Sequence, residues 1–547
     1  MSTWKSGAVT ALFAVFIVSI TLNSIGLSWG QTGHIPWQSD SLGGVTTLRQ
    51  MPYLFGKWKY KYPRVQFLIN AAFYKPMLDK WTKNPVWSTV EGNSKAVPRV
   101  LDFNRINTLI IISNIISAIM GTATVAAVFL MVRILFDDFL ASFLAALSLA
   151  CCHLFVFYSH LGNVDVPATF WFSWGMYFAI KAVYIGKWQH FLLAGLFCAL
   201  SACTKDPMPV FIAGLVLAVF IAMLKNARSQ GKAFKEALCS IFNMKLLVAI
   251  VAFLFVYALL NDILTFPSAF VERFSHWIGG RGVTAFNKGF VGQGPLLWGA
   301  CKVMYGAFGW PLLASILISL VYCVIKNPCK SMLGIIPIVL FYIVIVVNVR
   351  MVAPRFFIPA FPCLVLFVGK GFADWLRWHK FSFFLRVIPV IMIYVFSALY
   401  CIGLDLEMRN DSRYDAENWF VENVSPKTHV GVLCNVRWGP RLHILGYNCS
   451  FRAPLRKTNI GEEVLKQRPS YPKYLILLEN KLSIFNQNFL ESIFDGSLGY
   501  KRVARFENKY LYPRKTIFGI AGWPVSKTHL VSPAVEIYEK SQDDPFS

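Results

Sequence analysis

The sequence predicts a polytopic α-helical membrane protein that ends in a small α/β domain. The chain has 547 residues, of which 56% are hydrophobic and only 15% are charged, whereas about 25% of residues are charged in ordinary soluble domains. Apolar segments recur up to about residue 403, and their length is close to the roughly 20 residues that cross a bilayer as a helix. From about residue 405 the sequence becomes polar. We therefore assign residues 1–404 to a transmembrane domain and residues 405–547 to an α/β domain outside the cytoplasm.

The first apolar segment, residues 1–26, is expected to be a retained transmembrane helix with a cytoplasmic N-terminus. Its apolar run is longer than the core of a typical signal peptide. Residues 29–105 form a long loop that is rich in Trp, Tyr and Pro, which favours short segments lying at the membrane interface.

Ten further spans follow, about eleven in all. Residues 296–325 leave two possibilities open, one span preceded by an interfacial helix or a tight pair of helices. The ten spans are expected at residues 107–132, 139–158, 165–184, 190–204, 207–224, 246–263, 303–325, 331–348, 356–370 and 385–403.

The charges of the short loops set the predicted orientation. Residues 225–245 contain five Lys or Arg residues and residues 370–386 contain four, whereas residues 159–164 contain none. Because cytoplasmic loops carry the excess of positive charge, the two basic loops are placed in the cytoplasm. The long first loop and the C-terminal domain then face the exterior, the periplasm or the lumen, in a bacterial inner membrane, a plasma membrane or the endoplasmic reticulum.

The polar C-terminal region shows alternating strands and helices. Residues 428–433 and 474–478 are strand-like, and residues 414–422 are helix-like after the capping residues Asp411 and Ser412. Cys434 and Cys449 are the only two of the twelve cysteines in this polar region. They would form a disulfide if the region faced an oxidising compartment.

The net charge of +25 would suggest nucleic acid as the partner of a soluble protein. Here the cations lie in loops between apolar segments, so we expect membrane lipids and phosphorylated lipid substrates instead, and no nucleic acid. The sequence contains no P-loop, no dinucleotide-binding fingerprint, no H-E-x-x-H and no His/Cys metal cluster. A transferase without a nucleotide site most easily takes its sugar from a lipid carrier.

Two acids are candidates for catalysis. Asp40 follows the first span beside Pro36 and Trp37, and partial desolvation there would make it a stronger base; an exposed loop Asp is an equally good explanation. Asp165 opens the fourth predicted span, where capping alone also favours Asp. Two acids converging on one cavity would let one act as base while the other orients the acceptor, and they leave a bound divalent cation possible.

Four cations are predicted at the same membrane face as the two acids: Lys61, Lys205, Arg350 and Arg355. They would stabilise a lipid phosphate as it leaves, although cations at helix ends also commonly extend to the interface without any such role. The loop 261–293 adds Glu272, Arg273, His276 and Arg281 beside two glycines, which is compatible with a lid.

The order of these motifs resembles the GT-C membrane glycosyltransferases, in the branch of the protein O-mannosyltransferases and the aminoarabinose transferases that modify lipid A. The matching motifs are Asp40 after the first span, Lys61-Tyr62-Pro63 in the same loop, Asp165 at the fourth span, Thr204–Pro207 and Arg355–Pro359. Two positions depart from the pattern, because Ser41 stands where the mannosyltransferases often have Glu and Arg64 stands where a second Pro is usual. These departures leave the subfamily, and so the acceptor, open.

The resemblance implies a GT-C fold in residues 1–404, a polyprenyl- or dolichyl-phosphate sugar donor, and transfer with inversion outside the cytoplasm. It makes Asp40 the catalytic base and Asp165 a second acid of the cavity, with Lys61, Arg350 and Arg355 as contacts of the donor phosphate. The acceptor would be a lipid, a glycan or a protein. A transporter or flippase of a lipid-linked or anionic solute is the alternative, and it predicts charges in the middle of the membrane and internal symmetry.

Overall fold

The computed structural model divides into two compact units, which we describe separately. The helical unit comprises residues 1–27, 42–402 and 518–520, and the C-terminal unit comprises residues 28–41, 403–517 and 521–547. The structure describes residues 6–31, 37, 42–58, 60–81, 103–278, 292–350, 352–434, 438–451, 472–478, 487–508 and 531–541.

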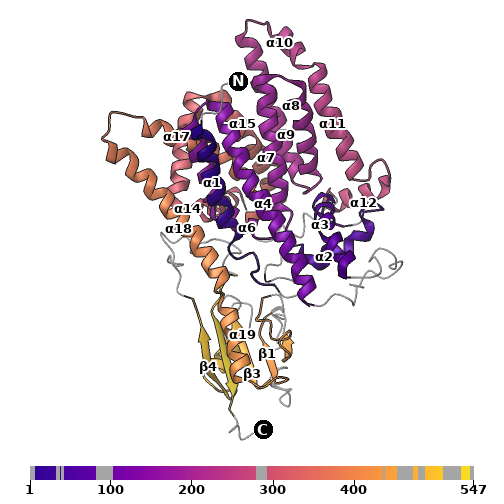
Figure 1. The fold of residues 1–547 in the computed structure, drawn as a ribbon, viewed down its shortest axis with the longest axis vertical. Helices are drawn as coiled ribbons and strands as arrows, with labels where there is room; N and C mark the ends of the chain where they lie inside the picture. Colours follow the sequence, from indigo (N-terminus) through magenta and orange to yellow (C-terminus); the bar gives the residue numbers. More distant parts are fainter. Residues whose placement is uncertain are drawn as a thin grey trace. The chain divides into compact units, whose positions relative to one another are not determined.

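A helix occupies each predicted apolar segment of the helical unit (Figure 1). These helices are α1 (Ser6–Ser24), α4 (Phe103–Phe136), α5 (Phe139–Ala150), α6 (His153–Ser159), α7 (Asp165–Ile185), α8 (Trp188–Ala202), α9 (Met208–Ser229), α11 (Met244–Leu260), α14 (Gln293–Lys326), α15 (Pro328–Phe341), the π-helical η3 (Tyr342–Val347), α17 (Ala360–Leu376) and α18 (Phe383–Arg409). Shorter helices connect them: α2 (Gly43–Gln50), η1 (Met51–Tyr53), α3 (Val65–Trp81), α10 (Phe234–Ile241), α12 (Pro267–Ile278) and α16 (Pro354–Phe357).

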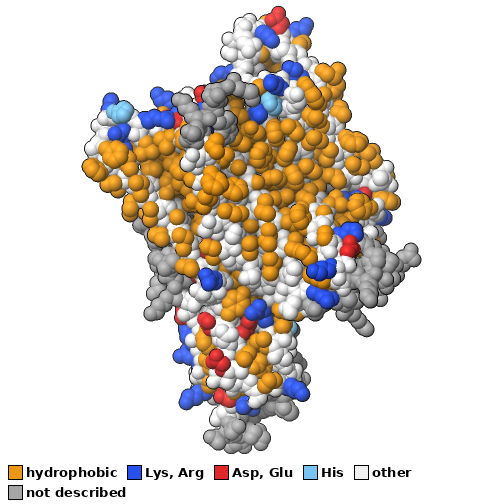
Figure 2. Space-filling model, in the orientation of Figure 1, with side chains coloured by type: hydrophobic (Ala, Val, Ile, Leu, Met, Phe, Trp, Pro, Cys, Tyr) orange, Lys and Arg blue, Asp and Glu red, His pale blue; other side chains and the backbone are white. Residues whose placement is uncertain are grey.

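The helical unit is that of a multi-pass membrane protein. By length and composition alone, five of the described helices are able to cross a membrane, or up to seven if two bent pairs each count as one span. Figure 2 shows apolar side chains over most of the visible face of this unit, with Lys and Arg towards its ends. On α11 none of the side chains is buried, as expected where lipid rather than protein is the solvent of an apolar helix.

Helices α7 and α8 form an antiparallel hairpin. Gly186 ends α7 with φ +73°, a left-handed conformation that glycine adopts without steric cost. Further along the hairpin, the hydroxyl of Ser201 donates to the carbonyl of Ala168 at 2.8 Å. The start of α7 and the end of α8 therefore lie at the same end of the unit.

Close helix contacts depend on glycine. A Cβ added to Gly369 of α17 would lie 2.3 Å from the carbonyl oxygen of Ala141 in α5, and one added to Gly195 of α8 would lie 2.3 Å from that of Ala249 in α11. Such small residues let backbones approach where no hydrophobic effect drives helices together. In α14, Gly309 has φ +69° and ψ +160°, so residues 293–326 form one helical run that is kinked at Gly309.

The C-terminal unit contains a five-stranded sheet of order β2-β1-β3-β5-β4. Strands β1 and β2 run parallel, as do β1 and β3, whereas β5 is antiparallel to both β3 and β4. The strands are β1 (His429–Val432), β2 (Asn448–Phe451), β3 (Tyr474–Leu478), β4 (Tyr500–Phe506) and β5 (Val535–Lys540), and the helices are α19 (Ser412–Asn423) and α21 (Gln487–Phe494).

Alternation along β3 explains the layers of this unit. Ile476 and Leu478 pack in the cluster that contains Phe420 of α19, whereas Leu475 and Leu477 pack with residues of α21. Successive side chains of a strand point to opposite faces, so the two helices cover opposite sides of the sheet. The predicted strand at residues 474–478 and the predicted helix after Asp411 are both confirmed, and Cys434 and Cys449 are free thiols in the structure.

Candidate functional site

The hairpin of α7 and α8 brings Asp165 and Lys205 together. Asp165 is the first residue of α7, and Lys205 lies in the turn that follows α8. The Nζ of Lys205 forms an ion pair with Oδ1 of Asp165, and both side chains are buried, at 4% and 3% exposure. Two residues that the sequence placed at one membrane face therefore form a direct contact.

The third element of this cluster is the short helix α16. The Nζ of Lys205 donates to the carbonyl of Arg355 at 3.1 Å and lies 4.4 Å from the ring centroid of Phe356. The guanidinium of Arg355 lies 5.2 Å from the same ring. Burial of an ammonium is costly unless a counter-ion and hydrogen bonds compensate it, and here a carboxylate, a carbonyl and an aromatic face all do so.

A second buried pair lies at the start of α3. Arg64 forms an ion pair with Asp262, at 8% and 3% exposure, and the backbone N–H of Trp58 donates to Asp262 at 3.0 Å. The guanidinium of Arg64 also donates to the carbonyl of Leu54 at 3.1 Å. These contacts hold the loop before α3 against the turn after α11.

The two pairs are linked through the turn that contains Lys205. The backbone N–H of Val65 donates to the carbonyl of Cys203 at 3.2 Å, and the amide of Asn261 donates to the Sγ of Cys203 at 3.0 Å. Arg273 of α12 reaches the same place, where it contacts Asp206 at 3.3 Å and Asn261 at 2.5 Å. The result is one polar cluster, which we call the turn cluster, built from Arg64, Asp165, Lys205, Asp206, Asn261, Asp262, Arg273 and Arg355.

The other predicted site residues have different surroundings. Lys61 is exposed, with its Nζ 5.0 Å from the ring centroid of Tyr62. Arg350 is exposed and has φ +51°. Asp40 lies outside the described residues. Among the proposed lid residues, Glu272 and Arg273 belong to α12, His276 is in α12 without a described side chain, and Arg281 lies outside the described residues.

Sequence reasoning missed Arg64, Asp206 and Asp262 as members of the turn cluster. Arg64 was noted only as a departure from a Pro-Pro pattern. The sequence nevertheless indicated that two of these acids lie at helix ends. Asp206 directly follows Lys205, and Asp262 follows an apolar run. Within the described residues, no group of three or more His, Cys, Asp or Glu side chains is arranged to hold a metal ion.

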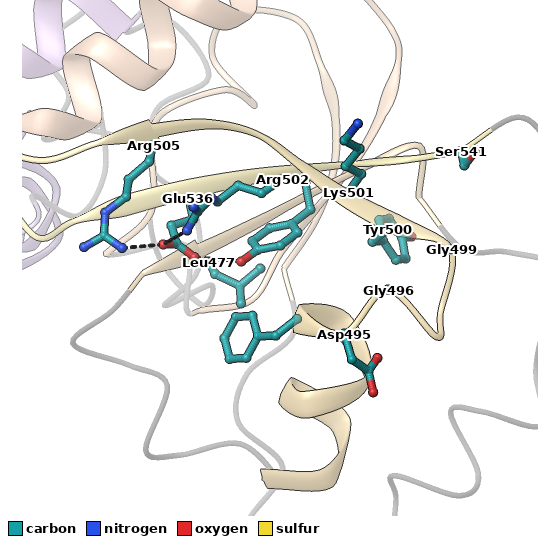
Figure 3. A pocket seen from close by; sticks show the side chains of 12 residues that line it. Leu477, Asp495, Gly496, Gly499, Tyr500, Lys501, Arg502, Arg505, Glu536 and Ser541 are labelled. Carbon is teal, nitrogen blue, oxygen red and sulfur yellow. Dashed lines mark hydrogen bonds and ion pairs between the residues drawn. The ribbon is translucent and has the colours of Figure 1, made fainter.

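The C-terminal unit contains a separate cavity of about 770 Å³. Figure 3 shows Arg502 and Arg505 pointing toward Glu536, and Leu477 also lines the cavity. Both guanidinium groups contact Oε1 of Glu536, at 3.1 and 2.7 Å, and the hydroxyl of Tyr538 donates to its Oε2 at 2.8 Å. None of the predicted site residues lines this cavity.

Comparison with known proteins supports the interpretation of the helical unit. Residues 109–235 match the family model described as dolichyl-phosphate-mannose-protein mannosyltransferase. This segment includes both Asp165 and Lys205. No curated protein matches the chain.

Several solved glycosyltransferases are similar in fold. An oligosaccharyltransferase of Archaeoglobus fulgidus, solved with zinc and sulfate, aligns with a TM-score of 0.46 and 15% identity over 86% of this chain and 68% of its own. ArnT of Cupriavidus metallidurans, bound to undecaprenyl phosphate, aligns with a TM-score of 0.46 and 12% identity over 97% of this chain and 98% of its own. The Pmt1–Pmt2 complex of S. cerevisiae, bound to its sugar donor, aligns with a TM-score of 0.38 and 13% identity over 49% of this chain and 35% of its own.

The family match agrees with the resemblance to GT-C glycosyltransferases that the motifs indicated, and that resemblance is confirmed.

Proposed function

We propose that this chain is a membrane glycosyltransferase with a polyprenyl- or dolichyl-phosphate sugar as donor. The proposal is supported by the match of residues 109–235 to the family of dolichyl-phosphate-mannose-protein mannosyltransferases. The acceptor hydroxyl or amine attacks C1 of the sugar, and the bond between C1 and the phosphate oxygen breaks. The bonding electrons leave with the lipid phosphate, Asp40 takes the proton of the acceptor, and the configuration at C1 is inverted.

The turn cluster is the observation that carries this proposal. It concentrates buried charges at one end of an apolar helical unit, and its central ion pair, between Asp165 and Lys205, lies inside the segment that matches the family. Asp165, which forms the buried ion pair with Lys205, serves as the second acid of the cavity. Lys61, Lys205, Arg350 and Arg355 are the proposed contacts of the donor phosphate, whose negative charge grows as the sugar leaves.

A backbone contact fixes the chain just before Asp165. The N–H of Leu42 donates to the carbonyl of Gly162 at 3.0 Å, and Gly162 is three residues before Asp165. In the sequence, Asp40 is two residues before Leu42.

The proposed site faces away from the cytoplasm. Helix α9 begins just after Lys205 and ends at Ser229, within the basic segment of residues 225–245. A spanning helix thus separates the turn cluster from the segment that the positive-inside rule assigns to the cytoplasm. The turn cluster then lies on the exterior, periplasmic or luminal side.

The test is donor turnover by the purified protein in membranes that contain native acceptors, with a panel of radiolabelled polyprenyl-phosphate sugars. We expect the wild type to consume one donor and Asp40→Asn to lose about 10²–10⁴-fold of that rate, the usual contribution of a general base. Asp79→Asn is the matched control, because Asp79 is an exposed residue of α3 whose partner is Lys75. If the wild type transfers sugar from no donor but moves the lipid across the membrane, the transporter alternative replaces this proposal.

A further inference from the structure

Three helices of the helical unit enclose a cavity of about 710 Å³, which we call the helix cavity. Its walls are the part of α14 after the kink at Gly309, the end of α17 and the first half of α18 (Figure 1). This volume lies within the roughly 300–1,000 Å³ of typical ligand pockets. No residue of the turn cluster lines the helix cavity, so it is separate from the proposed site of sugar transfer.

Contacts with α17 fix the other two walls. A Cβ added to Gly371 of α17 would overlap the Oγ of Ser319 in α14, so these two helices pack closely through small residues. The indole N–H of Trp375 donates to the carbonyl of Arg386 in α18 at 3.1 Å. The guanidinium of Arg386 donates in turn to the carbonyl of Leu376 at 2.6 Å. The helix cavity is therefore a preformed space between helices that are fixed to one another.

The helix cavity has the depth of one membrane leaflet. Along α14 its lining extends from Ser315 to Lys326, which are eleven positions apart. At the helical rise of 1.5 Å per residue this separation is about 16 Å, and half of a hydrocarbon core about 30 Å thick is about 15 Å. The space therefore suits one acyl chain of a phospholipid, which also extends through a single leaflet.

The deep part of the helix cavity suits hydrocarbon. Ile318 of α14 and Val390 and Ile393 of α18 line it. The hydroxyl of Ser315 also lines it and donates to the carbonyl of Pro311 at 2.8 Å, so burial of this hydroxyl under an acyl chain leaves its hydrogen bond intact. Ile318 is 71% exposed, which leaves the helix cavity open to the surrounding lipid on this side.

The other end of the helix cavity, near Lys326, lies at the membrane interface. Trp375 and Trp378, at the end of α17, line it there, and Trp is enriched where lipid headgroups meet the apolar core. The neighbouring residues 370–386 are one of the two basic segments that the positive-inside rule assigns to the cytoplasm. In the proposed orientation the helix cavity therefore lies in the cytoplasmic leaflet.

One positive charge at this end has no counter-ion among the described residues. Asp374 and Lys326 are the described charged side chains that line the deep wall and the mouth. Asp374 accepts hydrogen bonds from the ammonium of Lys370 at 2.6 Å and from the hydroxyl of Tyr322 at 2.9 Å. Lys326 is exposed and forms no ion pair within the described part of the chain. We propose that the helix cavity binds one phospholipid with an anionic headgroup, whose acyl chain lies between α14 and α18 and whose phosphate contacts Lys326.

Charge and chain length both favour this occupant. A zwitterionic headgroup would bring its own cation to a mouth whose acid already pairs with Lys370, whereas an anionic headgroup gains a charge-assisted contact with Lys326. Polyprenyl phosphate carries a similar phosphate, but its isoprenoid chain is longer than one leaflet and exceeds the depth of the helix cavity.

Photo-crosslinking of the purified full-length protein in phosphatidylcholine nanodiscs tests the proposal. The probe is a small fraction of phosphatidylglycerol with a diazirine in its acyl chain, and labelled residues are mapped by mass spectrometry. Helix α11, on which no side chain is buried, reports ordinary contact with lipid. A contact between charged groups is worth about a factor of ten or more, so we expect residues 315–326, 371–378 and 389–393 to be labelled about tenfold more than α11. Equal labelling would overturn the proposal, because the lipid would then act only as solvent.

Two lysine variants test the headgroup contact. Lys326→Gln removes the charge and keeps a side chain of similar length, and it should lower labelling of the helix cavity by the phosphatidylglycerol probe about tenfold. Labelling by a phosphatidylcholine probe should change less than about twofold, because that headgroup carries no net charge. Lys225→Gln is the matched control, since Lys225 is exposed near the end of α9 and does not line the helix cavity.

Two results would overturn the assignment of the occupant. The first is labelling by the phosphatidylglycerol probe that Lys326→Gln leaves at the level of the wild type. The second is displacement of the probe by excess polyprenyl phosphate but not by excess unlabelled phosphatidylglycerol, which would identify a polyprenyl lipid as the occupant. These experiments require no sugar donor, so their outcome is independent of the proposed function.

Discussion

The ion pair between Asp165 and Lys205 allows a quantitative test of the turn cluster. Both side chains are at most 4% exposed, so removing one partner leaves the charge of the other buried and uncompensated. Such losses typically cost about 3–5 kcal/mol. For Asp165→Asn the ammonium keeps the carbonyl of Arg355 and the ring of Phe356, which places the expected loss near the lower limit, about 3 kcal/mol.

The double variant should be less damaging than the two single changes suggest. Asp165→Asn with Lys205→Met removes both charges of this pair, and replacing a buried ion pair by neutral groups of similar size is often close to neutral. Since each single change should cost about 3 kcal/mol or more, we expect a coupling energy of at least about 3 kcal/mol in the double-mutant cycle, which is the upper end of measured couplings.

The assay is unfolding of the protein in detergent micelles, followed by tryptophan fluorescence. The exposed pair Lys75–Asp79 of α3, at 56% and 46% exposure, provides the control cycle, and its coupling should stay below about 0.5 kcal/mol. A coupling equally small for Asp165 and Lys205 would refute the buried pair.

Two further predictions concern the opposite end of the helical unit and its packing. Burial raises the pKa of Asp138, but hydrogen bonds from Arg377 and from a backbone N–H outweigh this effect and lower the pKa from 3.8 to about 2. The stability that Asp138 contributes is therefore present above about pH 4 and is lost as the pH falls to about 2. The difference in Tm between the wild type and Asp138→Asn should therefore be constant near neutral pH and shrink as the pH falls from about 4 to about 2. A difference in Tm that does not change across this window would contradict the lowered pKa. Gly369→Ala should lower the Tm, because the new Cβ would lie 2.3 Å from a backbone oxygen, whereas Gly294→Ala, with no atom within 4 Å, should not; equal effects would contradict the packing of α5 on α17.

The sequence predicted the helices well because a spanning segment must satisfy its backbone hydrogen bonds within itself. Segment length and apolar character are therefore sufficient to locate it. The helix after Asp411 was predictable for a similar reason, since the capping side chain accepts the N–H of Arg413 two residues on. In both cases the interactions that define the element are local in sequence.

The contacts that build the site are not local, and they could not be predicted. Trp58 donates to Asp262 across 204 residues of sequence. Periodicity and capping signals report only on neighbours within a few positions. Motif order indicated that Asp165 and Lys205 share a membrane face, but it gave no information on which cation pairs with which acid.

The distribution of ion pairs in the helical unit bears on the choice between a transferase and a transporter. In the described part of this unit, one group of pairs lies in the turn cluster, and a second group surrounds Asp138, which pairs with Lys370 and Arg377. Helices α5 and α6 separate Asp138 from the start of α7, and the two groups lie at opposite ends of a spanning segment if this bent pair counts as one span. A transporter of an anionic solute needs its charged site near the middle of the membrane, where broken helices expose backbone groups to the substrate. Charges gathered at the ends of the helices instead suit a reaction between a lipid phosphate at the interface and an acceptor in water, because the phosphate never has to cross the apolar region.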